Sequence, residues 1–263
     1  MRRHSPTSIT QPRGFRAAGG TCGIKPSGKP DLALIVSDVP CATAAVFTTN
    51  KVKGAPVLVS QKHVRNGKAR AIVCNSGTSN VATGEQGLRD AEAMCQTTAA
   101  ALGLRYASEV LVASTGVIGH RLPMDKVLPG IEQLAPTLAQ GKKADNAAAD
   151  AILTTDLVRK TALRTVTLGG KTVTLGGICK GSGMIAPNMA TMLAFITTDA
   201  AIDSKPLKLA LRAATSETFN RLSVDSDKST SDSVMVLANG QAKNRIISGP
   251  GKVFDRFVET LTD

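Results

Sequence analysis

Residues 179–195 read CKGSGMIAPNMATMLAF, and this stretch decides how the chain is interpreted. A passage rich in glycine and other small residues, stiffened by Pro187, leads into an apolar strand expected over 191–197. Thr191 places a hydroxyl at the start of that strand. Taken alone, such a threonine is explained by the strand preference of β-branched residues, so the pattern predicts a loop and a strand but no chemistry.

The flanking sequence predicts further elements on both sides. Upstream, the near-duplicates TVTLGG at 165–170 and 172–177 predict a β-hairpin that turns through Gly169, Gly170 and Lys171. Downstream, apolar residues recur at helical spacing over 206–222. A polar loop is expected at 225–232 and a strand at 233–238.

The first half of the chain mixes short strands and separate helices. Apolar, β-branched runs predict strands at 31–37, 44–48, 70–75 and 110–114. A helix is expected after Thr83, where Gln86 completes the spacing of a capping box, and Gly103 ends it. A second helical segment is expected over 131–153. This irregular succession predicts an α+β fold rather than a regular βαβ repeat.

Composition restricts the class of protein. The 263 residues are 42% hydrophobic and 20% charged, which suits one large domain or two small ones with a real core. The longest apolar stretches, 110–113 and 192–196, fall far short of the roughly 20 residues of a membrane span. The five cysteines are widely spaced and form no C-x-x-C motif, so we expect a protein of the reducing cytoplasm without disulfides or a zinc site.

The net charge of +12 is unevenly distributed. Residues 1–190 hold 23 basic and 11 acidic residues, whereas 191–263 hold nine of each. The chain has one Tyr, six Phe and no Trp, so stacking surfaces for nucleic acid are scarce. We therefore expect a solvated basic face or attraction of small anionic substrates rather than nucleic-acid binding. The basic segment 1–16 is interpreted as a short extension, with an organelle-targeting presequence as the alternative.

No G-x-S-x-G, H-E-x-x-H or P-loop motif occurs, but the sequence resembles a known family. The stretch KGSGMIAPNMATMLAFITTDA at 180–200 resembles the autocleavage segment of the ornithine acetyltransferase family, the bifunctional glutamate N-acetyltransferases of arginine biosynthesis. Further matching stretches follow in the same order, at 12–24 (PRGFRAAGGTCGI), 46–56 (VFTTNKVKGAP), 75–90 (NSGTSNVATGEQGLRD), 113–119 (ASTGVIG), 153–156 (LTTD) and 220–240. The resemblance begins at about residue 11, which leaves little room for a cleaved presequence.

The resemblance implies a fold and a chemistry. The expected fold is of the autoprocessing N-terminal-nucleophile type, with layered sheets covered by helices. The chain is expected to cut itself between Ala190 and Thr191, giving an α chain of residues 1–190 and the beginning of a β chain at 191–263. The cut exposes the α-amine of Thr191, a suitable base for its own hydroxyl nucleophile. Thr115 and Gly116 are expected to form the oxyanion hole.

The resemblance also implies residues that bind substrate. Lys180 and Thr154 match such positions, although the neighbouring Thr155 makes the second match less secure. The loop at 225–232 departs from the family pattern, and we assign it no catalytic role.

The implied reaction moves an acetyl group from N-acetylornithine to glutamate through acetyl-Thr191, with no cofactor or metal and with acetyl-CoA as a further donor in bifunctional members. The family forms heterotetramers of two cleaved pairs. Family members continue well beyond residue 263, so this chain is expected to be C-terminally truncated. Two alternatives stay open: a related N-terminal-nucleophile amidase or aminopeptidase, and an inactive remnant or basic binding module.

Overall fold

A mixed β-sheet forms the centre of the fold. The computed structural model describes residues 8–186 and 192–263. Within these ranges the strand order is β4-β3-β2-β8-β7-β6-β5, and β1 pairs with β2 in addition. The strands are β1 (Phe15–Gly20), β2 (Leu32–Phe47), β3 (Lys68–Thr78), β4 (Val110–Val117), β5 (Lys160–Leu168), β6 (Lys171–Lys180), β7 (Leu193–Thr198) and β8 (Ser233–Ala238).

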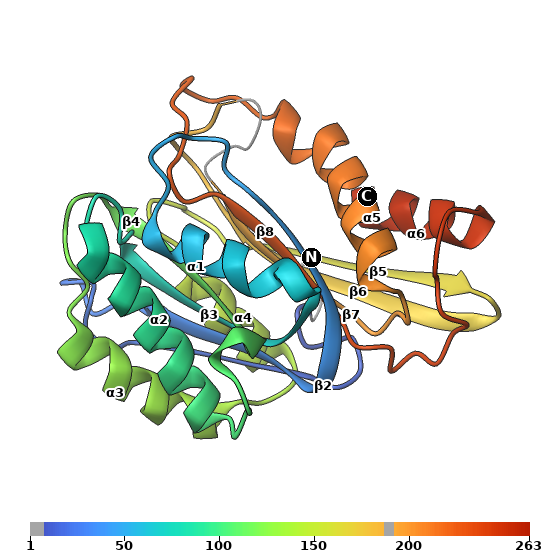
Figure 1. Cartoon of the computed structure of the whole chain (residues 1–263), viewed down its shortest axis with the longest axis horizontal. Helices are drawn as coiled ribbons and strands as arrows, with labels where there is room; N and C mark the ends of the chain where they lie inside the picture. The colour runs from blue at the N-terminus through green and yellow to red at the C-terminus, as the bar shows by residue number, and fades with distance from the viewer. Residues whose placement is uncertain (1–7, 187–191) are drawn as a thin grey trace, which may run out of the picture.

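Helices cover this sheet on two sides, with α1, α2 and α3 on one side and α5 and α6 on the other (Figure 1). The α-helices are α1 (Ala55–His63), α2 (Gly84–Ala101), α3 (Met124–Leu134), α4 (Lys142–Ala151), α5 (Ser204–Glu217) and α6 (Lys252–Thr262). Short 3₁₀ turns follow α1, α3 and α5 and precede β4. In the described part of the chain, no helix combines the length and the hydropathy that crossing a membrane requires.

Strand β2 joins the two halves of the sheet. Its first part pairs with β1 and β3, and its second part, from Ala42 to Phe47, pairs with β8. Between Val36 and Cys41 the register with β3 shifts, and Pro40 lies in this interval. A register shift of this kind bends a strand, and proline is tolerated at such points because it cannot donate to a ladder. The bend allows one sheet to fold over into two facing halves.

Three clusters of buried apolar side chains show the resulting layers. One cluster joins residues of both halves, such as Ile72 and Leu111 with Phe195 and Met235, and fills the space between them. The second packs the β2–β4 half against α1, α2 and α3. The third packs the β5–β8 half against α5 and α6. The order helix, sheet, sheet, helix confirms the α+β class and the layered architecture.

Most predicted elements are present, but several differ in detail. The strands predicted at 31–37 and 44–48 are parts of the single bent strand β2. The helical segment predicted at 131–153 is two helices, because Pro136 enforces a 3₁₀ turn after α3 and Gly141, at φ +97°, starts α4 in another direction. The strand predicted at 191–197 begins in the structure at Leu193, and position 191 lies outside the described residues.

The start of α2 also differs from its predicted cap. Thr83 is the N-cap residue, but its hydroxyl donates to the Oδ1 atom of Asn80 and caps no backbone N–H. Gln86 donates instead to the Asp90 carboxylate, one turn ahead. Competition from nearby side-chain acceptors has therefore replaced the predicted capping box. Gly103 ends the helix as predicted, at φ +63°.

Two adjacent glycines in β6 provide a test of the layer packing. A Cβ at Gly176 would lie 1.9 Å from the carbonyl oxygen of Ser8, whose segment crosses that face, whereas a Cβ at Gly177 would meet nothing nearer than 3.6 Å. We expect Gly176→Ala to lower the free energy of unfolding by about 1–3 kcal/mol. Gly177→Ala should change it by less than about 0.5 kcal/mol. Urea unfolding of both variants measures the difference, and equal effects would contradict the packing described.

Candidate active site

A pocket of about 1080 Å³ opens where the two halves of the sheet face each other. Thr115, Gly116, Thr154 and Lys180 all line it. These residues are far apart in the sequence and come from β4, from the loop after α4 and from the end of β6. The fold therefore brings together every site residue predicted from the sequence that lies in the described part of the chain. Ala190 and Thr191, the predicted cleavage site and nucleophile, lie outside the described residues.

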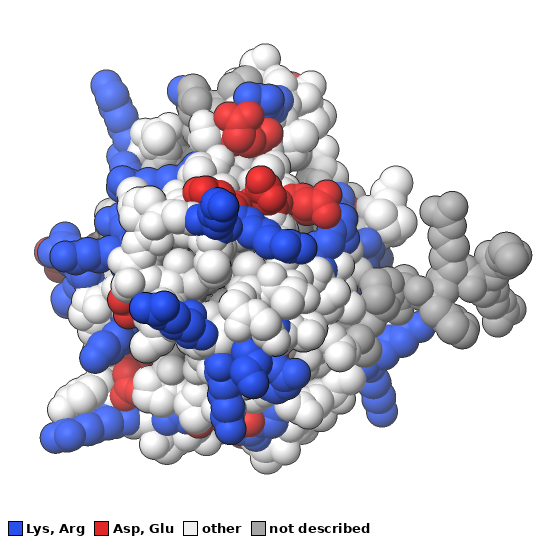
Figure 2. Space-filling model, turned by 90° about the vertical axis from the view of Figure 1, so that its right-hand side faces the viewer, with Lys and Arg blue, Asp and Glu red and all other residues white. Residues whose placement is uncertain are grey.

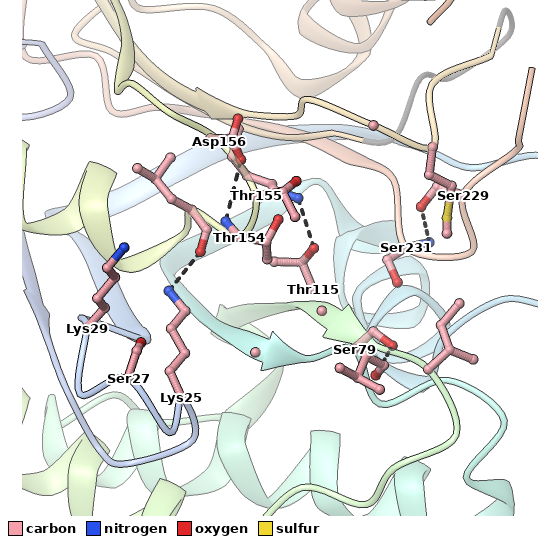
Figure 3. A pocket seen from close by; sticks show the side chains of 18 of the residues that line it. Lys25, Ser27, Lys29, Ser79, Thr115, Thr154, Thr155, Asp156, Ser229 and Ser231 are labelled. Carbon is pink, nitrogen blue, oxygen red and sulfur yellow. Dashed lines mark hydrogen bonds between the residues drawn. The ribbon is translucent and has the colours of Figure 1, made fainter. Parts of the chain in front are cut away.

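Figure 3 shows that polar side chains enter this pocket from several segments. They are Thr115 at the end of β4, the segment 154–156 after α4, Lys25 and Lys29 in the loop before β2, Ser79 after β3, and Ser229 and Ser231 in the loop before β8.

The close pairing of β4 with β3 at Thr115 and Gly116 depends on glycine. These residues pair with Ser76 and Gly77 of the parallel strand β3. Gly116 has φ +132°, and a Cβ there would lie 2.3 Å from the carbonyl carbon of Gly77. Any other residue would push the two strands apart. The close approach holds the Thr115 hydroxyl, which is almost fully buried, at the wall of the pocket.

A buried lysine contacts that hydroxyl from the opposite half of the sheet. The Nζ atom of Lys180 donates to Oγ1 of Thr115 at 3.1 Å, and only 3% of the Lys180 surface is exposed. Because an ammonium group only donates, Thr115 is the acceptor in this bond and keeps its own hydroxyl proton for another partner. The Thr115 hydroxyl can therefore still act as a donor, which is what an oxyanion hole requires.

Burial lowers the pKa of Lys180, and the negative charge of Asp156 opposes that change. The Lys180 ammonium is buried, but in the described part of the chain it donates to a neutral hydroxyl and not to a carboxylate, so its charge is only partly compensated. Such a group favours an anionic ligand in the pocket, because the ligand's charge would compensate for the water that the lysine has lost.

Asp156 holds the end of β6, which carries Lys180, in place. Its buried carboxylate accepts a hydrogen bond from the backbone N–H of Gly181 at 2.7 Å and pairs with Lys160 at 2.5 Å. Burial alone would raise the pKa of Asp156, but the hydrogen bonds from Lys160 and Gly181 and the charge of Lys180 lower it overall. Asp156 ends the LTTD stretch that contains Thr154, but no sequence pattern marked it as a site residue.

The structure separates the two candidate threonines of the LTTD stretch. The Thr155 hydroxyl is 2.6 Å from the Ser182 hydroxyl and bonds to it. In the described part of the chain, the Thr154 hydroxyl makes no hydrogen bond. This arrangement favours Thr154 as the hydroxyl that remains for a ligand.

Lys25 supplies a second cation to the pocket, which no sequence motif predicted. Its Nζ donates to the carbonyl oxygens of Pro30 at 2.6 Å and Leu153 at 2.7 Å. The Asp31 carboxylate accepts the backbone N–H groups of residues 22, 24 and 25 and so holds the loop in place. Burial lowers the pKa of Lys25. The only sequence signal was a turn-rich segment, KPSGKP, directly after a matching stretch.

Two aspartates accept backbone hydrogen bonds on either side of the predicted cleavage segment. The carboxylate of Asp225 accepts the backbone N–H groups of Met184 and Ile185 at 2.6 and 2.8 Å. Asp232, at the other end of the same loop, accepts the N–H of Met192 at 3.0 Å. The loop at 225–232 therefore has a clear structural part in the site, which its departure from the family pattern concealed.

The positive charge is not gathered into one continuous area on the face shown in Figure 2. Basic side chains occur there in separate groups with neutral surface between them, and acidic side chains lie close to some of these groups. On this face the distribution of charged side chains is typical of a solvated surface.

Comparisons with known proteins agree with the resemblance. The ArgJ family model matches residues 16–263. The chain is 53% identical over 245 residues to the arginine biosynthesis bifunctional protein ArgJ of Symbiobacterium thermophilum, covering 92% of this chain and 60% of that protein. The corresponding protein of Bacillus subtilis is 46% identical over 241 residues, covering 91% and 58%. The chain thus spans about three fifths of the length of these relatives.

Solved structures of the same family also resemble this chain. The bifunctional ArgJ protein of Bacillus halodurans is 44% identical, with a TM-score of 0.65 over 70% of this chain and 94% of that one. The ornithine acetyltransferase of Mycobacterium tuberculosis, complexed with ornithine, is 40% identical, with a TM-score of 0.62 over 69% and 95%. An aminopeptidase of Ochrobactrum anthropi, described as a variant of the Ntn hydrolase fold, is only 12% identical with a TM-score of 0.54 over 97% and 84%, and it shares the fold alone.

The variant Asp156→Asn tests whether this carboxylate holds the end of β6 that carries Lys180. We expect the variant to lose about 1.5–3 kcal/mol of stability at pH 7, because the charge-assisted bonds to Gly181 and Lys160 weaken. The folded state lowers the pKa of Asp156, so its contribution is present above the ordinary pKa of about 3.9 and is lost as pH falls through the lower folded value. Urea unfolding should therefore show a difference at pH 7 that shrinks at pH 3.

The exposed Asp125, in the first turn of α3, serves as the control. Asp125→Asn should change stability by less than about 0.5 kcal/mol at either pH. An Asp156→Asn variant as stable as the wild type at pH 7 would show that the carboxylate does not hold the end of β6 in place.

Proposed function

Because the chain belongs to the ArgJ family, we propose that it is an acetyltransferase chain of arginine biosynthesis, moving an acetyl group from N-acetylornithine to glutamate. The observation that carries the proposal is the buried contact between Lys180 and Thr115 at the pocket wall. It places a cation and an orientable hydroxyl donor at one point. The relatives are longer than this chain, so what we propose about activity, substrates and partners concerns the whole protein.

The proposed chemistry begins with cleavage between Ala190 and Thr191. A threonine hydroxyl is a weak nucleophile at neutral pH, and the α-amine released at Thr191 has a reference pKa of about 8, which suits a general base. The Thr191 hydroxyl then attacks the acetyl carbonyl of N-acetylornithine. Ornithine leaves, and the amine of glutamate takes the acetyl group from the ester.

Both acyl steps pass through a tetrahedral oxyanion, for which we propose the Thr115 hydroxyl and the Gly116 N–H as donors. The bond from Lys180 supports this role, because it leaves the Thr115 proton directed away from the lysine. Preorganised donors of this kind stabilise the charge that develops only in the transition state.

Substrate recognition is proposed for Lys180 and Thr154. Lys180 offers a buried positive charge to the α-carboxylate that both substrates share. Thr154 offers a pocket-lining hydroxyl that has no hydrogen-bond partner among residues 8–186 and 192–263. Acetyl-CoA is proposed as a further acetyl donor, following the bifunctional description of the relatives. The chemistry proposed for these residues requires no cofactor or metal.

The order of the strands supports a lasting association of the two proposed cleavage products. Strands β7 and β8, which come after the proposed cut, lie between β2 and β6, which come before it. The two products therefore stay joined through ladders on both sides, and we propose that two such pairs form a heterotetramer. All five cysteines are free, which suits the reducing cytoplasm in which we place the protein.

Cleavage is tested by intact mass spectrometry. We expect the wild-type chain to yield fragments of 190 and 73 residues, counted from the sequence on either side of the Ala190–Thr191 bond. Thr191→Ala should remain a single chain, because it lacks the attacking oxygen, whereas Thr191→Ser should still be cut. A wild-type chain that stays whole, or an alanine variant that is cut at the same bond, would contradict the proposal.

The oxyanion role is tested by comparing two buried threonines in neighbouring strands. Thr115→Ala should lower kcat for acetyl transfer by about 10²–10³ with little change in KM, because the lost donor acts in the transition state. Thr78→Ala removes a similar side chain from β3 that does not line the pocket. We expect it to keep kcat within a few fold. Equal losses in both variants would assign Thr115 a structural role only.

A further inference from the structure

Self-cleavage requires a base that the mature site does not. Before the cut, the nitrogen of Thr191 belongs to an amide bond and cannot accept a proton. The Thr191 hydroxyl nevertheless has to lose its proton in order to attack the carbonyl of Ala190. Another group must therefore act first, and it must lie near the start of β7.

Asp232 lies at this point in the structure. Its Oδ1 atom accepts the N–H of Met192, the residue bonded directly to Thr191. The residue is fully buried. Its second oxygen, Oδ2, has no hydrogen-bond partner in the described part of the chain. Leaving a buried carboxyl oxygen without a hydrogen-bond partner costs folding free energy, so this atom calls for an explanation.

Three other charged groups near this end of the sheet already have hydrogen-bond partners. Asp156 bonds to Gly181 and Lys160, and both oxygens of Asp225 accept backbone N–H groups. Lys180 donates to Thr115. Among the carboxylates described at this end of the sheet, Asp232 combines burial, a bond to the residue after Thr191 and an unpaired oxygen.

We propose that Asp232 is the general base and acid of self-cleavage, a role that rests on the proposed function and precedes the mature catalyst. The ionised carboxylate takes the proton from the Thr191 hydroxyl, and the oxygen forms a bond to the carbonyl carbon of Ala190. The tetrahedral intermediate collapses by breaking the bond between that carbon and the nitrogen of Thr191, which receives the proton back from Asp232. One water molecule then hydrolyses the ester, giving the Ala190 carboxylate and restoring the Thr191 hydroxyl.

The environment of Asp232 suits a group that both takes and returns a proton near neutral pH. Burial raises its pKa to about 7. The N–H of Met192, the hydroxyl of Ser229 and the positive charge of Lys180 favour the ionised form, but burial outweighs them. Because only the ionised form accepts the proton, the cleavage rate should rise as pH increases through about 7 and then level off.

Cleavage of freshly translated, labelled chain, followed by gel at a series of pH values, tests this role. Asp232→Asn keeps the size of the side chain but cannot act as a base, and we expect cleavage to slow by about 10²–10⁴-fold. Asp232→Glu should recover part of the rate. The wild-type profile should show the inflection near pH 7, and Asp232→Asn should lack it.

Asp199→Asn is the matched control. Asp199 is also a buried aspartate, at the other end of β7, where it accepts the N–H of Thr174 and pairs with Arg13. We expect Asp199→Asn to be destabilised but to be cut at a rate within a few fold of the wild type. This variant separates the loss of a base from the loss of a buried acidic group.

The outcomes separate this inference from the proposed function. If Asp232→Asn is cut at the wild-type rate while Thr191→Ala stays whole, the role of Asp232 is overturned and the proposed function stands. A wild-type profile without an inflection near pH 7 also counts against Asp232, whether or not the variant folds. A wild-type chain that is never cut overturns both.

Discussion

The hydrogen bond between the buried ammonium of Lys180 and the hydroxyl of Thr115 is the contact around which the site is organised. These residues belong to strands β6 and β4, which are separated by β7, β8, β2 and β3 in the order of the sheet. In a flat sheet they would lie far apart, since neighbouring strands are spaced about 4.8 Å from each other. They meet because the sheet folds over at the bend in β2. The pocket is therefore a direct result of this bend.

The same fold explains how the two products of the proposed cleavage can stay together in one folded unit. Strands β7 and β8, which follow the proposed cleavage bond, lie between strands that precede it, and a shared apolar cluster lies between the two halves of the sheet. Asp225 and Asp232, in a loop after the bond, hold the described backbone on both sides of it. The described residues on both sides of the proposed cleavage bond are therefore held in place by carboxylates of one loop.

Local elements of this fold were predictable from the sequence because they depend on local chemistry. The β5–β6 hairpin follows from its two-glycine turn, and α2 ends at Gly103 because that position needs φ > 0. The bend in β2 was not predictable, since its two apolar parts look like separate strands. Thr115, Gly116, Thr154 and Lys180 were identified only through the family resemblance, because a lone threonine or lysine carries no pattern. Asp232 was missed because its burial and its bond to Met192 depend on tertiary structure.

The central claim is that Thr191 becomes an acyl carrier in the pocket formed by the folded sheet. It is tested most directly by incubating the protein with N-acetylornithine, quenching in acid, and locating the acetyl group by mass spectrometry. The account predicts one acetyl ester on the first residue of the 191–263 fragment, removed when glutamate is added. An acetyl group on Lys180 or elsewhere in the larger fragment, or transfer to glutamate without any covalent acetyl group, would contradict it.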